Sequence, residues 1–250
     1  AVAQDSIQAF TASDFTAPEK FTRFCENGGL PLCGLIGGTE VSGSMNAVID
    51  AINPGTKEVL ARVSEMGYDE VNQAVEVGYQ AYHGGWKDTS VEERKTSVMK
   101  LVDLFERDLD VFLACEILNG GKVSELAKGD MDAVRKSAEY FVGVAKETQF
   151  GEGAIADVDS NLQAYTYVEP WGVVAGIIPW NYPVVLTAWF MMPALMAGNC
   201  IIIKPSEETP LSALYFGLLA REAGFPPGVV NVLPGRGEIT GKFISEHPGI

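Results

Sequence analysis

The chain has 250 residues, 47% of them hydrophobic, so it can bury the core of at least one large globular domain. Its 18 basic and 33 acidic residues give a formal net charge of −15, which repels nucleic-acid phosphates and anionic membrane surfaces, and neither is expected as a partner. No apolar run reaches the roughly 18 residues that a transmembrane helix requires, so no membrane span is predicted.

Residues 1–30 are of mixed character with isolated phenylalanines, and they are predicted to form an extended N-terminal arm that lies on another part of the molecule. The opening residues contain neither Met nor the basic-then-apolar pattern of a signal peptide, which indicates a processed or cut terminus. From residue 35, short apolar runs between turn residues predict a small antiparallel layer, with strands near 35–38, 47–49 and 59–63.

Amphipathic helices are expected next. Asp69 is predicted to cap the first, and Ser90 with Glu93 forms a capping box that opens the second. Apolar residues spaced three and four apart predict a third helix over about 125–146. An alternating strand over 161–169 can pair either with another subunit or within the chain, and the sequence leaves both open.

The C-terminal third predicts a β-α-β-α-β order. Apolar runs suited to buried strands alternate with segments suited to helices, in the order 173–178, 184–196, 200–203, 211–223 and 229–233. Strands that are apolar on both faces and separated by helices predict an α/β fold, a parallel sheet with helices on both faces. Ligands of such sheets bind beyond the carboxyl ends of the strands, so the turns after the three strands are the candidate site.

The first of these turns holds Asn181 between two prolines, Pro179 and Pro183, which fix a sharp exit from the strand. A rigid amide in this place is suited to donate a hydrogen bond to a carbonyl oxygen on which charge develops. The alternative is an asparagine that only hydrogen-bonds the backbone of the turn.

The second and third turns carry a charge pair and a set of glycines. Glu207, three residues after Lys204, suits the two hydroxyls of an adenosine ribose and repels a 2′-phosphate, so NAD is favoured over NADP. The alternative is a surface ion pair. In the third turn Gly235, Gly237 and Gly241 permit close backbone approach, but their spacing differs from the dinucleotide fingerprint and is a weak signal alone.

Several sequence segments of this region resemble those of the aldehyde dehydrogenase superfamily. They are Glu-Pro-Trp-Gly-Val-Val at 169–174, Pro-Trp-Asn-Tyr-Pro at 179–183, Pro-Ala-Leu-Met-Ala-Gly-Asn at 193–199, Lys-Pro-Ser-Glu at 204–207 and Glu-Ala-Gly-Phe-Pro-Pro-Gly-Val-Val-Asn at 222–231. With earlier phrases at 36–38 and 53–56, the likeness covers about residues 30–250. It implies NAD-dependent oxidation of an aldehyde to a carboxylic acid. It also implies an incomplete NAD-binding domain over 31–250, with an oligomerisation hairpin at about 150–169.

The resemblance also implies residue roles. Asn181 would be the oxyanion donor, and Lys204 and Glu207 would hold the adenosine ribose of NAD. The rest of the cofactor groove would be lined by Ile178, Pro179, Trp180, Pro205, Ser206, Gly237 and Gly241, and the aldehyde tunnel by Tyr182, Leu186 and Trp189. In this family the dinucleotide lies differently on the sheet than in Rossmann enzymes, which agrees with the missing fingerprint.

The family's chemistry needs a cysteine thiolate and a glutamate base, and neither is matched here. Cys200 is predicted to be a buried strand residue, so both groups are expected beyond Ile250, in a catalytic domain outside this chain, and the chain alone is expected to be inactive. The alternative is a non-catalytic scaffold subunit. Phe190 stands where many members carry lysine, which puts a proton relay there in doubt, and the stretch 118–122 lacks the customary acidic residue.

Substrate, partners and compartment follow less directly. Tyr182 and Trp189 lie seven residues apart, so both rings can face one cavity and hold a quaternary ammonium by cation–π attraction of about 1–2 kcal/mol, as in betaine aldehyde or amino-aldehyde dehydrogenases. Ordinary aliphatic and aromatic aldehydes are the alternative. The four cysteines form no metal or disulfide pattern, which predicts no metal site and a cytoplasmic or organelle location, the latter after removal of a targeting segment. A homo-oligomer, or association with a chain that carries the catalytic domain, is expected.

Overall fold

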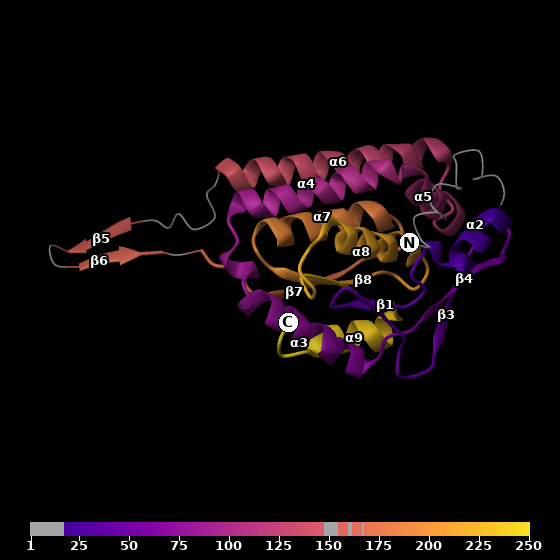
Figure 1. Ribbon diagram of the computed structural model, residues 1–250, viewed down its shortest axis with the longest axis horizontal. Coiled ribbons are helices and arrows are strands. Elements are labelled where there is room, and N and C mark those ends of the chain that lie inside the picture. The colour runs from indigo at the N-terminus through magenta and orange to yellow at the C-terminus, as the bar shows by residue number, and fades with distance from the viewer. Residues whose placement is uncertain (1–17, 148–154, 160–161, 167) are drawn as a thin grey trace.

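The computed structural model describes residues 18–147, 155–159, 162–166 and 168–250. At its centre is a five-stranded sheet of order β2-β1-β9-β8-β7 (Figure 1). Its strands are β1 (Gly34–Ile36), β2 (Thr39–Val41), β7 (Val173–Ile177), β8 (Cys200–Lys204) and β9 (Val230–Val232). The last three run parallel, which confirms the predicted β-α-β-α-β unit.

The first two strands differ from the prediction. They were expected in a separate antiparallel layer, but β1 pairs antiparallel with β9 and so extends the central sheet. All three residues of β1 are buried, which explains why this strand lies within the core. Of the strands expected in that layer, β3 (Val48–Ile52) and β4 (Val59–Ser64) do form a separate two-stranded sheet.

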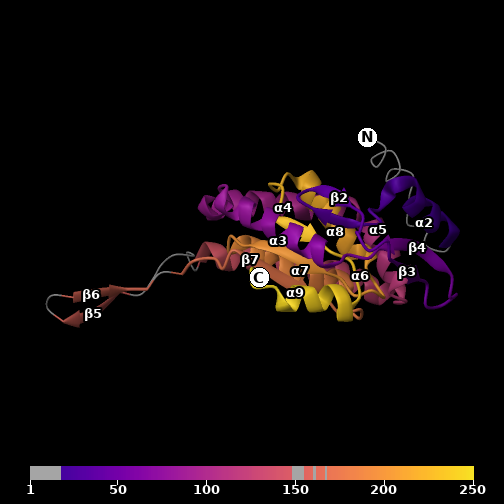
Figure 2. The ribbon, with the colours of Figure 1, turned by 90° about the horizontal axis from the view of Figure 1, so that it is seen from below.

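Helices cover both faces of the sheet (Figures 1 and 2). The helices α7 and α8 pack on one face, α4 and α6 lie outside them, and α3 with α9 covers the other face. Their bounds are α3 (Tyr68–His83), α4 (Val91–Arg107), α6 (Ser124–Glu147), α7 (Pro183–Met196), α8 (Leu211–Ala223) and α9 (Lys242–Glu246). In the part of the chain that the structure describes, no helix is both long and apolar enough to cross a membrane.

The two predicted helix starts have different outcomes. The capping box of α4 is confirmed, because the Glu93 amide donates to Ser90 Oγ (3.2 Å) and the Ser90 amide donates to Glu93 Oε2 (2.7 Å). The predicted cap at Asp69 is wrong. The cap of α3 lies two residues earlier, at Gly67, whose amide donates to Glu70 Oε2 (2.7 Å), so Asp69 lies in the first turn.

The predicted extended arm is helical where the structure describes it. The helix α2 (Pro18–Phe24) continues into one π-helical turn, η2 (Cys25–Gly29), and residues 1–17 lie outside the described part. Phe21 and Phe24 are both buried, with ring centroids 6.2 Å apart. Side chains spaced three residues apart share one face of a helix, and this spacing is the signal that the sequence prediction missed.

The alternating strand pairs within the chain. The strand β6 (Leu162–Tyr165) is antiparallel to β5 (Ile155–Asp159), and this hairpin projects away from the sheet and its helices (Figures 1 and 2). The rest of the predicted 150–169 hairpin includes residues 150–154, 160–161 and 167, which lie outside the described residues. Its role in oligomerisation stays a prediction.

An aromatic cluster joins α4, α8 and the short helix α5 (Leu109–Ala114). Phe112 lies at its centre, with ring centroids 4.6 Å from Phe105, 4.8 Å from Phe216 and 5.2 Å from Tyr215. All four side chains are fully or almost fully buried. The Tyr215 hydroxyl donates to Asp108 Oδ2 (2.9 Å), so the polar atom of the cluster has a partner.

Candidate functional site

The carboxyl ends of the three parallel strands meet at one edge of the sheet (Figure 1). In the strand register Ile177 lies opposite Lys204, and Ile203 lies opposite Val232. Beyond the strands the Ile178 amide donates to the Lys204 carbonyl (2.8 Å), which continues the pairing into the turns. The three predicted turns are therefore neighbours in space.

The Lys204 side chain joins the second turn to the third. It is only 2% exposed, and its ammonium donates to the carbonyls of Pro205 (2.7 Å) and Gly235 (2.6 Å). Glu207 Oε2 lies 3.7 Å from the same nitrogen. Burial lowers the pKa of Lys204, while Glu207 and Glu65 oppose that shift. Because the ammonium is buried and holds two backbone carbonyls, the surface ion-pair alternative is wrong.

Glu207 makes a second link between these turns. Its Oε1 accepts from the amide of Gly237 (3.3 Å), and its side chain stays partly open to solvent. Gly237 and Gly241 differ in the space that surrounds them. A Cβ on Gly237 would meet nothing within 4 Å, whereas a Cβ on Gly241 would make ordinary contact with the Lys204 side chain at 3.5 Å. The position that admits no side chain is Gly235, where a Cβ would lie 1.7 Å from Thr240 Oγ1.

A buried carboxylate that sequence analysis missed holds the third turn. Glu65 is fully buried and accepts from the Arg236 amide (3.0 Å), Nε (2.9 Å) and an Nη (2.7 Å). Arg236 thereby holds the pKa of Glu65 below its usual value. The next residue, Met66, donates its amide to the Pro234 carbonyl and accepts from Thr240 Oγ1. No local pattern signals a pair 171 residues apart.

Asn181 lies on the first turn and is exposed. Its side chain makes no hydrogen bond to any described residue, so the alternative in which it binds the turn backbone is not supported. The turn is joined to the second one through Thr209, whose Oγ1 donates to the Trp180 carbonyl (3.4 Å). Pro183 is the first residue of α7, which ends the turn sharply, as predicted.

Comparison with known proteins identifies the family of this chain. The family model described as "Aldehyde dehydrogenase family" matches residues 41–250. The chain belongs to the aldehyde dehydrogenase family. Human retinal dehydrogenase 2 is 42% identical over 206 residues, 81% of this chain and 39% of that protein. Aldehyde dehydrogenase [NAD(P)+] 1 of Saccharomyces cerevisiae is 40% identical over 203 residues, 81% of this chain and 40% of that protein.

Solved structures give the same assignment. A betaine aldehyde dehydrogenase from Staphylococcus aureus, solved in complex with NAD+, has a TM-score of 0.87 and 30% identity, and the match covers 95% of this chain and 46% of that chain. The aldehyde dehydrogenase chain described here thus spans about two fifths of the length of the curated relatives it matches.

The remaining predicted site residues of this aldehyde dehydrogenase chain differ in their exposure to solvent. Tyr182, the residue before α7, and Trp189 on α7 are about half exposed, and Leu186 between them is partly buried. The Lys122 ammonium lies 4.6 Å from the centroid of the Tyr182 ring, which sequence analysis did not foresee. Of the residues predicted to line a cofactor groove, Pro179 and Trp180 are exposed, whereas Ile178, Pro205 and Ser206 are buried.

Three of the four cysteines, Cys25, Cys115 and Cys200, are buried and lack the setting of a nucleophile. Cys200 is fully buried on β8, as predicted, and burial raises its pKa to about 12. Burial also raises the pKa of Cys25 to about 12 and that of Cys115 well above its usual value. Because the thiolate is the reactive form, these thiols are inert at neutral pH. No group of metal-ligating side chains occurs among the residues that the structure describes.

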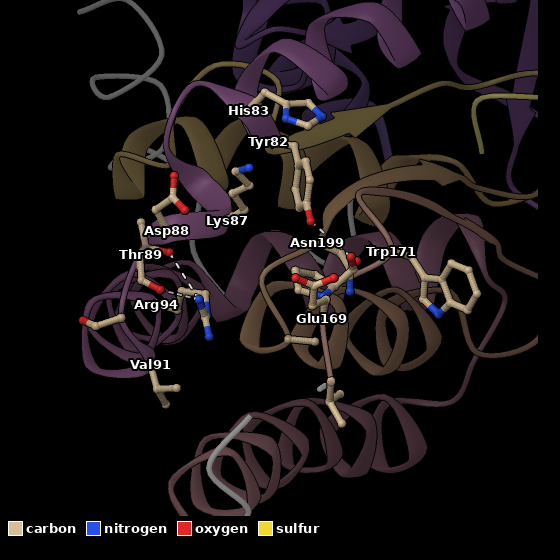
Figure 3. Close-up of a pocket in the computed structure, with 14 residues that line it drawn as sticks. Tyr82, His83, Lys87, Asp88, Thr89, Val91, Arg94, Glu169, Trp171 and Asn199 are labelled. Carbon is tan, nitrogen blue, oxygen red and sulfur yellow. Dashed lines mark hydrogen bonds between the residues drawn. The ribbon is translucent and has the colours of Figure 1, made fainter. Parts of the chain in front are cut away.

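A cavity of about 680 Å³ opens at the opposite edge of the sheet (Figure 3). It lies beside the amino ends of the strands, since Trp171 and Asn199, which line it, come shortly before β7 and β8. Arg94 is buried there and donates to the carbonyl of Thr89 (Figure 3). It also donates to the carbonyl of Met196 (3.0 Å), so this cation holds the backbone. Parallel α/β sheets bind ligands at the other edge, and this cavity is not assigned to the cofactor.

Proposed function

We propose that the protein of which this chain forms part oxidises an aldehyde to a carboxylic acid with NAD as the hydride acceptor. This chain supplies the cofactor groove and the oxyanion donor. The observation that carries the proposal is the buried Lys204 ammonium, which joins two strand-end turns and lies 3.7 Å from Glu207 Oε2. The catalytic cysteine and glutamate then come from outside residues 1–250.

The residues present fit a dinucleotide. The ammonium of Lys204 has three donors and gives two to carbonyls, so one can serve a ribose hydroxyl. The Glu207 carboxylate can accept from the two hydroxyls, and the open space over Gly237 admits close approach to the backbone. When bound, NAD supplies the acceptor for the hydride. Asn181, which has no partner among the described residues, is left to donate to the aldehyde oxygen.

Calorimetry on this chain tests the cofactor assignment. We expect NAD to bind at least about tenfold more tightly than NADP, because a 2′-phosphate would meet the Glu207 carboxylate. The variant Glu207→Gln should bind NAD about tenfold more weakly, since a hydrogen bond to a charged group contributes about 1.5–3 kcal/mol. The difference between its affinities for NAD and NADP should also be smaller than in the wild-type chain. Glu238→Gln is the matched control, because Glu238 is an exposed acid of the third turn.

Two results would contradict this assignment. Equal affinities for NAD and NADP in the wild-type chain would remove the role of Glu207. A folded chain without affinity for either dinucleotide would instead favour the alternative, a non-catalytic scaffold subunit.

For the substrate we propose an uncharged aliphatic or aromatic aldehyde. Tyr182 and Trp189 are exposed two helical turns apart, and similarity to a betaine aldehyde dehydrogenase speaks for a cationic substrate. However, the Lys122 ammonium already lies over the Tyr182 ring, so a quaternary ammonium would have to use the other face. We expect the whole enzyme to have a higher kcat/KM for propanal than for betaine aldehyde. A preference for betaine aldehyde would restore the cation cage.

A further inference from the structure

The segment 116–122 contacts the first two strand-end turns, although the sequence predicted no functional residue in it. Its residues belong to the π-helical turn η4 (Cys115–Asn119) and the loop that follows. Glu116 is fully buried, and its Oε1 accepts from the amide of Val184 (3.2 Å). Val184 is the second residue of α7, and Tyr182, the cap residue, offers no side-chain cap. Glu116 therefore caps α7 from outside that helix.

Lys122 extends this contact to the ring of Tyr182. Its ammonium bonds Glu116 Oε2 (2.8 Å) and the carboxylate of Asp130, and it lies 4.6 Å from the ring centroid. Burial lowers the pKa of Lys122, but the two carboxylates outweigh it and raise the value overall, so this side chain is a cation at neutral pH. Lys122 thus contacts the residue directly after Asn181, Tyr182, and Glu116 holds the backbone two residues further on, at Val184.

Asn119 makes the matching contact with the second turn. It is 4% exposed, and its Nδ2 donates to the carbonyls of Glu208 (2.9 Å) and Ile52 (3.3 Å). Glu208 directly follows Glu207. An amide can serve two carbonyl acceptors, which a carboxylate cannot do, and this is a physical reason for an uncharged residue in the stretch 118–122, where the family customarily has an acid.

We propose that Glu116, Asn119 and Lys122 are positioning residues and that they orient two different turns. Glu116 and Lys122 orient the turn that carries Asn181, and Asn119 orients the turn that carries Glu207. A purely structural role does not need this chemistry, because burying a carboxylate and a cation costs more than burying apolar side chains of similar volume. The assignment of the turns to oxyanion and ribose rests on the proposed function, whereas the orientation itself does not.

Hydrogen exchange on the chain without ligand tests the orientation. In Lys122→Met we expect amide exchange to rise at least about fivefold in the peptide that covers 180–186 and to stay unchanged over 206–210. In Asn119→Ala the pattern should reverse. Lys128→Met is the matched control, because Lys128 pairs with Glu125 on the exposed side of α6. An equal rise in exchange in both peptides, or no change in either variant, would overturn the proposal even if the chain binds NAD.

Kinetics of the whole enzyme test whether one turn affects kcat and the other affects the affinity for NAD. Lys122→Met should lower kcat about tenfold with the Kd for NAD within twofold, because a small displacement of a donor affects the reacting geometry. Asn119→Ala should raise that Kd about fivefold and leave kcat at saturating NAD unchanged. Parallel losses of kcat and affinity in both variants would show a structural role only. A wild-type chain that binds no NAD would contradict the proposed function and leave the exchange result to decide the orientation.

Discussion

Phe112→Ala is expected to lower the free energy of unfolding of this chain by about 3–5 kcal/mol, the largest stability change that we predict for a single substitution. The side chain is fully buried, and its ring contacts those of Phe105, Tyr215 and Phe216. Truncation removes the buried apolar surface and leaves a cavity among three rings that belong to two helices, Phe105 to α4 and both Tyr215 and Phe216 to α8. Those rings cannot close the space without moving α4 against α8.

Urea denaturation followed by circular dichroism measures this change, and a Tm about 10 °C lower is the corresponding thermal result. Phe190→Ala is the matched control, because that ring is 42% exposed on α7. We expect the control to cost less than about 1 kcal/mol. If both variants lost the same stability, the aromatic cluster would not be the centre of the core.

The sequence predicted the parts of the fold whose causes are local. The three parallel strands and the two helices between them appear as runs of apolar residues of the right lengths, and the structure confirms them within one or two residues. The capping box of α4 is equally local, since both partners, Ser90 and Glu93, lie within one helical turn. For the same reason the positions of Asn181, Lys204 and Glu207 at strand ends could be predicted.

The parts that were missed depend on contacts between distant residues. Leu35 pairs with Val232 across almost the whole chain, and nothing near Leu35 indicates that its strand joins the central sheet rather than a separate layer. Glu65 was not singled out from the sequence, although it is fully buried and holds Arg236. Buried ion pairs of this kind have no sequence period, so their positions become visible only when the partners are placed in space.

The candidate site shows the same division. The sequence located the two turns that carry Asn181 and Glu207, but it could not show that Lys204 donates to the Gly235 carbonyl. It also gave no sign of Lys122 over Tyr182. The residues that would touch a ligand follow strand ends and are predictable. The residues that orient them come from other elements and are not.

Lys204→Met is expected to weaken NAD binding about 10- to 100-fold in a chain that still folds. Methionine keeps the apolar stem that packs near Gly241, but it leaves the Gly235 carbonyl without its charged donor and removes the cation beside Glu207. Hydrogen bonds to charged groups contribute about 1.5–3 kcal/mol each, which sets the expected range. Calorimetry with NAD measures the loss, and Lys242→Met, an exposed lysine at the start of α9, is the control. An unchanged affinity in a folded Lys204→Met chain would mean that the joined turns do not bind adenosine.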